Sequence, residues 1–209
     1  MKIEHIDKGL HRILVPFEDL TTTVYVVVNC GGVAIIDSAT YPSDVDQYIL
    51  PGLQEFGISQ DEVRYLPLTH KHGDHAGGIY RLAECFPYAK VRASFELPLQ
   101  EGELLADGER FLGCLQTVSL PGHTKNSVGF YDVRTKTLLS GDCLQLKGIG
   151  KYRNGISYPD LYKQSIERLR QMDIARIVAA HEYDPLGSLA EGKAAVAQYL
   201  KTCLDVLIK

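Results

Sequence analysis

The sequence lacks any long apolar run. No stretch approaches the roughly 18 residues that a helix needs to cross a bilayer. The segment Met1–Asp7 carries charges where a signal peptide would have its apolar core. From these two absences we expect a protein with no membrane segment that works in the cytoplasm.

Cysteine is scarce and shows no pairing pattern. The five cysteines are widely spaced, and no two of them form a Cys-x-x-Cys pair. This is poor material for a disulfide framework and fits a reducing compartment. Linkers, low-complexity segments and blocks of like charge are missing too, so we expect residues 1–209 to form a single domain.

An excess of positive charge is also absent. The chain has 22 basic and 26 acidic residues, with a net charge of -4. This balance does not favour a surface that coats nucleic acid. We expect a small-molecule substrate, and neither nucleic acid nor a membrane as a partner. The oligomeric state is not predicted.

Short β-branched runs and helical spacings alternate along the chain. Strands are expected at 12–15, 23–28, 33–37, 63–69, 91–94, 115–120, 127–131, 137–139 and 176–180. Helices are expected from Ser43, with an interruption at Pro51-Gly52, and over about 75–85, 159–172 and 187–207. This interleaving predicts an α+β fold of stacked sheets covered by helices.

Three of the seven histidines crowd into one short segment directly after an expected strand. His70 and His72 are two residues apart, so an extended chain points both side chains to the same side. We expect Gly73 to take a positive φ and turn the chain sharply. Asp74 and His75 would then return toward the same point from the start of the next helix.

Two glycines follow this segment at positions that read as helix. Gly77 and Gly78 each cost a helix about 1 kcal/mol relative to alanine. We expect them because the backbone must pass close to something there.

The histidine-rich segment needs further ligands from elsewhere in the chain. Four ligands from this short loop could hold one metal. The pairs His70/His72 and Asp74/His75 diverge, however, which favours two metals. His123 lies in a Pro-Gly-His-Thr turn, Asp142 follows an expected strand, and His181 ends another. Residues at strand ends converge on one edge of a sheet, so these three are the candidates.

The order and spacing of these motifs resemble the metallo-β-lactamase-fold hydrolase superfamily from about residue 10 to 205. The matching segments are Thr69-His70-x-His72-x-Asp74-His75, Pro121-Gly122-His123-Thr124, Gly141-Asp142 and His181. The resemblance implies a four-layer αββα sandwich with the site along one edge of the sheets. It implies that one metal is bound by His70, His72 and His123, the other by Asp74, His75 and His181, and that Asp142 bridges them.

The ligand types also indicate which metal is expected. Imidazole and carboxylate without thiolate suit zinc and tolerate iron or manganese. We expect two divalent metal ions, with Zn²⁺ preferred. A metal-bound hydroxide would attack a carbonyl or phosphoryl centre, since metals lower the pKa of water to about 7. Asp74 is a candidate to orient this nucleophile or take its proton.

Asp37 and Cys143 are the neighbours of this ligand set that need an explanation. Asp37 ends an apolar run, and the family commonly has an aspartate there that supports the metal loop; an ordinary strand-end role is the alternative. Cys143 follows Asp142, and neighbours in an extended segment face opposite ways, so Cys143 is expected to pack. β-Lactamases with a cysteine ligand have it where Asp142 stands, which argues against such an enzyme.

The loop over 147–155 suits contact with a substrate anion. It carries Lys147, Tyr152 and Arg153 among several glycines. A solvated basic loop is the competing interpretation. His5 and His11, outside all of these motifs, are expected to have ordinary packing or surface roles.

The leading hypothesis is a dinuclear hydrolase that acts on a small ester, thioester or lactone. One alternative is a persulfide dioxygenase-like oxidoreductase with a single iron held by His70, His123 and Asp142. A phosphodiesterase is another. Glyoxalase II enzymes usually have phenylalanine, and quorum-quenching lactonases tyrosine, where this chain has Gln145, so no subfamily is assigned.

Overall fold

The computed structural model describes residues 2–29, 31–97, 102–146 and 155–208. Its internal contacts divide the chain into two compact units. Unit 1 comprises Met1–Leu105 and Arg110–Gly113, and unit 2 comprises Ala106–Glu109 and Cys114–Lys209. That all 209 residues form one domain stays a prediction.

Unit 1 is built on a mixed sheet with the order β1-β2-β3-β4-β5-β6-β7. Its strands are β1 (Lys2–Asp7), β2 (Leu10–Phe17), β3 (Leu20–Asn29), β4 (Gly32–Ile36), β5 (Val63–Pro67), β6 (Lys90–Ala93) and β7 (Glu103–Leu104). Strands β1 to β4 are antiparallel neighbours, whereas β4 to β7 run parallel. The short strand β8 (Arg110–Phe111) also belongs to this unit.

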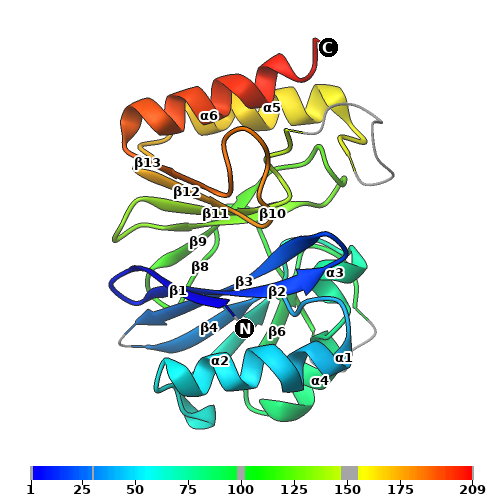
Figure 1. The fold of residues 1–209 in the computed structure, drawn as a ribbon, viewed down its shortest axis with the longest axis vertical. Coiled ribbons are helices and arrows are strands. Elements are labelled where there is room, and N and C mark those ends of the chain that lie inside the picture. Colours follow the sequence, from blue (N-terminus) through cyan, green and yellow to red (C-terminus); the bar gives the residue numbers. More distant parts are fainter. Residues whose placement is uncertain (1, 30, 98–101, 147–154, 209) are drawn as a thin grey trace. The chain divides into compact units, whose positions relative to one another are not determined.

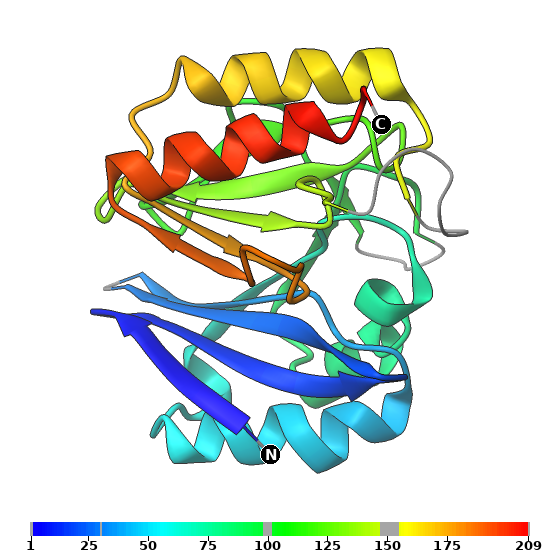
Figure 2. The same ribbon diagram turned by 45° about the horizontal axis from the view of Figure 1, so that its top comes forward.

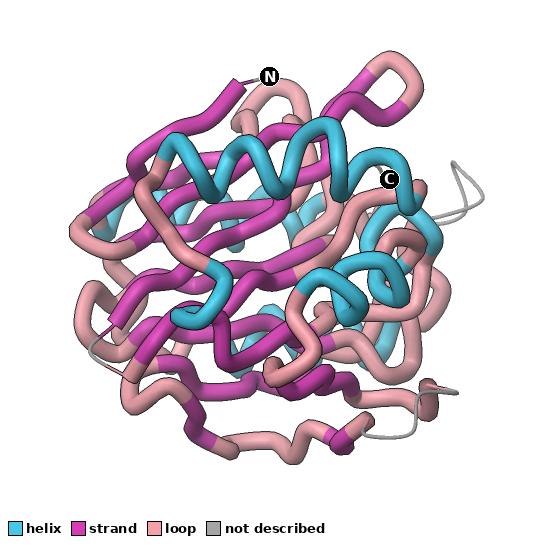
Figure 3. Tube along the Cα trace, turned by 90° about the horizontal axis from the view of Figure 1, so that it is seen from below, coloured by secondary structure: helices cyan, strands magenta, loops and turns pink. Residues whose placement is uncertain are grey.

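Short helices cover the sheet of unit 1 (Figures 1 and 3). They are α1 (Pro42–Asp44), the π-helix η1 (Val45–Ile49), α2 (Leu50–Glu55), the 3₁₀-helix η2 (Gln60–Glu62), α3 (Gly73–Ala76) and α4 (Ile79–Cys85). Val45, Ile49 and Leu53 recur at helical spacing and join the same buried cluster as Ile13 and Ile35 of the sheet. This stripe holds the helical segment against the strands.

The helical run of unit 1 passes through Pro51 without ending there. Pro51 lies in the first turn of α2, where its missing N–H costs least. The preceding turn is a π-helix in which the Leu50 N–H bonds to the Val45 carbonyl. The predicted interruption at Pro51-Gly52 is therefore wrong, because the π turn accommodates the proline.

Unit 2 contains the strand order β13-β12-β11-β10-β9. The strands are β9 (Leu115–Ser119), β10 (Val128–Asp132), β11 (Thr137–Gly141), β12 (Arg176–Ala179) and β13 (Leu189–Glu191). β10 is antiparallel to β9 and to β11, while β11 and β12 are parallel. Strands β9, β11 and β12 consequently run in the same direction, and their carboxyl ends lie at the same edge.

Two longer helices pack side by side on one face of this second sheet. They are α5 (Pro159–Arg170) and α6 (Lys193–Asp205), seen in yellow and red in Figures 1 and 2. Tyr162, Ile166 and Leu169 of α5 and Leu200 of α6 belong to one buried cluster with the strands. The spacing of the α5 residues is that of a single helical face.

The predicted α+β class is borne out in both units, because each combines a mixed sheet with helices. Other local features also differ from the predictions. Residues 187–192 are not helical, since Leu189–Glu191 forms β13 and the final helix begins only at Lys193. The edge strand β1 was not anticipated. Among the described residues, no helix is both long and apolar enough to cross a membrane.

Candidate metal centre

The histidine-rich segment of unit 1 lies at the carboxyl end of β5. His70 follows the strand by three residues, and His72 is the extended N-cap of α3. Asp74 and His75 lie in the only turn of that helix, with their side chains buried. The turn therefore brings the two halves of the segment back together within one unit.

By the distances between ligand atoms the four side chains form two pairs, and the His70 and His75 rings, with centroids 4.3 Å apart, are neighbours too. Ligand atoms of His70 and His72 lie within 4.8 Å of one another, and their ring centroids are 4.6 Å apart. Asp74 Oδ2 is 3.4 Å from His75 Nε2. His72 is partly exposed, whereas the other three are buried. Each pair supplies two groups of the kind that bind a transition metal.

Gly73 does not make the turn in the way the sequence suggested. It is the first residue of α3 and has no positive φ. The direction of the chain changes instead at His72, whose extended φ and ψ of -66° and 150° lead directly into the helix. The predicted positive φ at Gly73 is wrong, because an extended N-cap residue already provides the turn.

Asp37 lies beneath this segment, completely buried, just after β4. Its carboxylate accepts hydrogen bonds from the Thr69 backbone N–H at 2.8 Å and from the Thr69 hydroxyl at 2.8 Å. It also lies 2.7 Å from Nδ1 of His75. Asp37 thus fixes the orientation of the His75 ring and the start of the histidine-rich loop.

The backbone around Asp37 is in an uncommon conformation. Asp37 has φ 66° and Ala39 has φ 58°, in the left-handed region that residues with a side chain rarely occupy. The Ser38 N–H and hydroxyl both bond to the His75 carbonyl, at 2.6 and 2.9 Å. These bonds tie the strained segment to α3 and offset its conformational cost.

The same segment explains why residues 77 and 78 are glycines. A Cβ added to Gly77 would meet the Thr40 carbonyl oxygen, and one added to Gly78 would meet the Ser38 carbonyl oxygen. Both contacts would be far inside van der Waals distance. The expected close approach of the backbone is confirmed, and it also separates α3 from α4.

In unit 2, three candidate ligands follow the strands whose carboxyl ends share an edge. His123 comes after β9, Asp142 directly after β11, and His181 just after β12. Asp142 Oδ2 lies 3.5 Å from His123 Nε2, and Asp142 Oδ1 lies 3.2 Å from His181 Nε2. The two oxygens of this buried carboxylate therefore face two different imidazoles.

The ring of His123 is anchored on the opposite side. Its Nδ1 lies 3.0 Å from the Gly155 carbonyl oxygen and 3.4 Å from the amide nitrogen position of Gln145. Since a carbonyl only accepts, Nδ1 donates to it, and in a neutral ring Nε2 then presents a lone pair. The Ser127 hydroxyl accepts a hydrogen bond from the Thr124 N–H and holds the turn that follows His123.

This arrangement fits cations between the rings and the carboxylates. His75 and His123 each direct Nδ1 at an acceptor, so in a neutral ring Nε2 presents a lone pair. Those lone pairs face the oxygens of Asp74 and Asp142, which are themselves acceptors. Two acceptors that face each other repel, whereas a cation between them would be coordinated by both. A buried carboxylate is also stabilised by a positive charge nearby.

Two other predictions concern nearby residues. Cys143 is buried in the hydrophobic cluster of unit 2, as expected. Lys147, Tyr152 and Arg153 lie outside the described residues, so their contact with a substrate stays a prediction.

Sequence reasoning missed Tyr183. Its hydroxyl donates a hydrogen bond to Asp142 Oδ1 at 3.4 Å, and its ring lies edge-on to His181 with centroids 6.0 Å apart. The spacing of two residues from His181 was the available signal, because extended residues i and i+2 point the same way.

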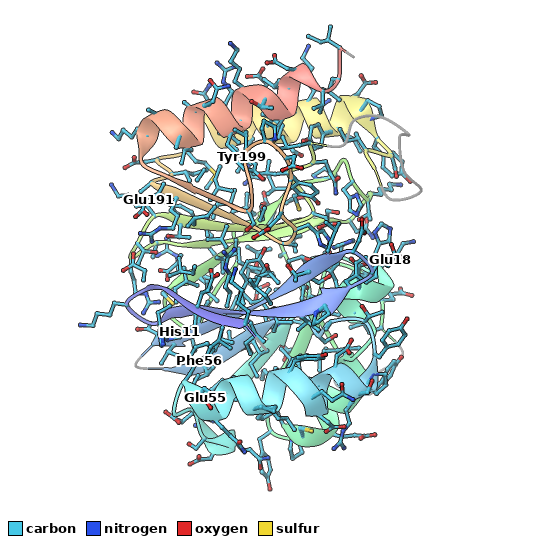
Figure 4. The ribbon with its side chains drawn as sticks, viewed as in Figure 1. His11, Glu18, Glu55, Phe56, Glu191 and Tyr199 are labelled. Carbon is cyan, nitrogen blue, oxygen red and sulfur yellow. The ribbon has the colours of Figure 1, made fainter. Side chains whose placement is uncertain are left out.

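His5 and His11 have the packing roles expected for them. They are opposite each other on β1 and β2, with their Nδ1 atoms 2.8 Å apart. The His11 ring stacks on Phe56 at a centroid distance of 4.5 Å (Figure 4). Burial, together with the neighbouring His5, lowers the pKa of His11.

Comparison with known proteins identifies the family. The Lactamase_B model, which describes the metallo-beta-lactamase superfamily, matches residues 18–181. The chain belongs to the metallo-beta-lactamase superfamily. This confirms the resemblance on which the ligand assignment rests.

The match to curated relatives of this superfamily member covers only part of each chain. An uncharacterized protein, YobT, from Bacillus subtilis (strain 168) is 34% identical over 151 residues, covering 59% of this chain and 62% of YobT. A hydroxyacylglutathione hydrolase from Synechococcus sp. (strain JA-2-3B'a(2-13)) is 35% identical over 158 residues, covering 72% of this chain and 58% of that protein. The chain spans about three fifths of the length of these two relatives.

Solved structures share the fold. A B3 metallo-beta-lactamase with an active-site glutamic acid has a TM-score of 0.76 at 19% identity, covering 99% of this chain and 88% of that chain. Rubredoxin oxygen:oxidoreductase from Desulfovibrio gigas has a TM-score of 0.75 at 17% identity, covering 98% and 61%. The predicted metallo-β-lactamase-like fold is confirmed. Because a hydrolase and an oxidoreductase share it, the fold alone does not decide the reaction.

Proposed function

We propose that this chain is a metal-dependent hydrolase that binds two divalent cations, with zinc preferred and iron or manganese tolerated. One observation carries the proposal. The two oxygens of Asp142 face two different imidazoles, those of His123 and His181. A carboxylate in this position suits a bridge between two cations, whereas a single cation would use only one of its sides.

The proposed ligands come from both units. One cation would be held by His70, His72 and His123, the other by Asp74, His75 and His181, with Asp142 shared. Ligand-atom distances within unit 1 support this division, because those of His70 and His72 lie within 4.8 Å of each other, as do those of Asp74 and His75. The hydrogen bond between Asp37 and His75 supports a ligand role for His75.

The reaction would be addition of water to a carbonyl carbon, followed by cleavage of its C–O or C–S bond. When bound, two divalent cations would acidify a water molecule and polarise the carbonyl oxygen. Asp74 would orient the attacking water and take its proton, which the leaving alkoxide or thiolate finally receives. The anchored Nδ1 atoms of His75 and His123 keep their rings in place during these steps.

The proposed substrate is a small ester, thioester or lactone. Among these, the thioester has the most support, because several relatives are hydroxyacylglutathione hydrolases and a hydroxyacyl-glutathione is a thioester. Lys147, Tyr152 and Arg153 remain proposed contacts for a negatively charged substrate.

A persulfide dioxygenase-like reaction with one iron is the second candidate. It would need only His70, His123 and Asp142 as ligands. It gives no ligand role to Asp74 or His75, although Asp37 orients the His75 ring. A phosphodiesterase is the third candidate, and no described contact favours it.

One substrate panel tests the proposal. Protein of measured metal content is assayed with a thioester, an ester, a lactone, a β-lactam and a phosphodiester, and oxygen uptake is measured with a persulfide. We expect two metal ions per chain, thioester, ester or lactone hydrolysis and no oxygen uptake.

The matched variants are Asp142→Asn and Asp132→Asn, since Asp132 is also buried in unit 2 but pairs with Arg134. Asp142→Asn should lower the rate about 100-fold or more, and Asp132→Asn should not. Activity confined to phosphodiesters, or oxygen uptake by protein with one iron, would overturn the proposal.

A further inference from the structure

The hydroxyl of Tyr162 holds the chain just after Asp142. Tyr162 lies in α5 and is completely buried. Its hydroxyl accepts a hydrogen bond from the Gln145 N–H at 2.9 Å and donates one to the Gln145 carbonyl oxygen at 2.8 Å. Both backbone groups of residue 145 are thus bound by one side chain, three residues beyond the proposed bridging carboxylate.

The same tyrosine touches the turn that carries His123. A Cβ added to Gly122 would lie 2.6 Å from both Cα and Cβ of Tyr162, so the turn packs directly on this residue. Gly122 has φ +152°, and its carbonyl accepts hydrogen bonds from the Ser157 and Tyr158 N–H groups at 3.0 and 2.8 Å. The turn is therefore fixed to the start of α5.

A further bond extends this attachment by one helical turn. The Ser165 hydroxyl donates to the Pro121 carbonyl oxygen at 2.7 Å. Ser165 lies three residues after Tyr162, on the same side of α5. The helix consequently holds the His123 turn through Ser165 and Gly122, and the Asp142 loop through Tyr162.

We propose that Tyr162 is a positioning residue that sets the spacing between the metal ligands His123 and Asp142. The inference rests on the proposed function, because it assumes that these two side chains bind a cation. His123 Nε2 and Asp142 Oδ2 are 3.5 Å apart, and their loops are joined to one rigid helix at Tyr162. A shift of either loop would move one of the two ligands away from the position that a shared cation needs.

The chemistry of the phenol suits this task. A hydroxyl can donate one hydrogen bond and accept others at once, which a backbone N–H and carbonyl together require. Burial, with further contributions from neighbours such as Cys203, raises the pKa of Tyr162 well above its ordinary value. The hydroxyl therefore keeps its proton and its donor role at any physiological pH.

Tyr162→Phe is the direct test, with Tyr199→Phe as the matched control. Tyr199 lies in α6 (Figure 4), is buried in the same cluster, and donates its hydroxyl to the Gly187 carbonyl at 3.3 Å. Both variants keep the ring and lose one buried hydroxyl. Affinity for Zn²⁺ is measured by competition with a chromogenic chelator, and the Co²⁺-loaded protein gives an absorption spectrum sensitive to ligand geometry.

We expect Tyr162→Phe to weaken Zn²⁺ binding about 10- to 100-fold and to alter the Co²⁺ spectrum. Tyr199→Phe should leave the Zn²⁺ affinity and the Co²⁺ spectrum unchanged, even if it lowers the melting temperature as much as Tyr162→Phe does. A Tyr162→Phe protein whose Zn²⁺ affinity and Co²⁺ spectrum match those of the wild type overturns the inference. Equal loss of affinity in both variants overturns it too, because this would indicate a general loss of packing.

Ser165→Ala provides a second route if Tyr162→Phe does not fold. Ser165→Ala removes one hydrogen bond to the same turn. It should weaken Zn²⁺ binding by about 10-fold, the lower end of the range expected for Tyr162→Phe. An unchanged affinity would overturn the inference. Failure of the proposed function is distinct, since it appears as a wild-type protein that binds Zn²⁺ but hydrolyses no ester, thioester or lactone.

Discussion

Single residues in this chain act mainly through the groups they hold. Asp37 is the clearest case, because its carboxylate joins Thr69 and His75 while its own backbone has φ 66°. Aspartate and asparagine tolerate this left-handed conformation better than other residues with a side chain. Position 37 therefore needs both a residue that tolerates a positive φ and a carboxylate. A substitution can remove the carboxylate and keep the backbone preference.

Asp37→Asn keeps the backbone preference and removes the charge. An amide has one acceptor oxygen, so it cannot accept from both the Thr69 N–H and the His75 Nδ1 proton, and one of these two anchors is lost. We expect Zn²⁺ affinity to fall about 10- to 100-fold, measured by chelator competition. Thr69→Val removes the hydroxyl contacts to Asp37 and to His70 Nδ1 but keeps the contact between Asp37 and His75, and it should cost less. Equal affinities in the wild type and Asp37→Asn would contradict this role.

At the scale of elements, contacts far apart in the sequence decide where helices stop. The spacing after His75 predicts one helix to Cys85, yet the chain forms α3 and α4 with a break at Gly77-Gly78. The break lies where the segment from Ser38 to Thr40 passes close by. Helical periodicity carries no information about such an approach.

Gly78→Ala tests the close approach against a nearby control. The added methyl would collide with the Ser38 carbonyl, so we expect about 1–3 kcal/mol of destabilisation. Gly73→Ala meets nothing within 4 Å and has no positive φ, so it should be neutral or stabilising by up to about 1 kcal/mol. Urea unfolding of the metal-free proteins measures both. Similar midpoints for the two variants would refute the steric explanation.

Asp107 links the residues before β9 to α5 and gives this contact a pH dependence. Burial alone would raise its pKa, but the Ser119 N–H at 2.8 Å and Arg168 at 3.0 Å outweigh it and hold the pKa below the ordinary value of 3.8. The folded state therefore binds the proton less tightly than the unfolded state. Its contribution is present above about pH 3.8 and is lost as the pH falls through the lower folded pKa.

We expect Asp107→Asn to be less stable than the wild type near neutral pH by at most about 1 kcal/mol, because the pair is partly exposed. The difference should shrink as the pH is lowered from 6 to 3 in urea unfolding experiments. A difference that grows on acidification would show that the sign is wrong.

At the scale of the whole molecule, the proposed cations draw ligands from both units. Binding to the folded chain alone stabilises it by about 2.7 kcal/mol when the free cation is 100 times its dissociation constant. For a chain of this size, that corresponds to a rise in melting temperature of about 5–11 °C. Chelation followed by Zn²⁺ addition, monitored by differential scanning fluorimetry, checks this. Asp142→Asn should respond much less, and a wild-type melting temperature indifferent to Zn²⁺ would contradict the proposal.

The sequence by itself determined the class of elements, most of their positions, and the identity and order of the candidate ligands. Those properties are local, since a strand end followed by histidine or aspartate is visible in a few residues. Only the tertiary structure decided how Asp37 meets His75, why Gly77-Gly78 breaks a helix, and that Tyr162 holds two loops. Each of these contacts joins segments separated by 17 or more residues, and no local pattern records which distant segments will pack together.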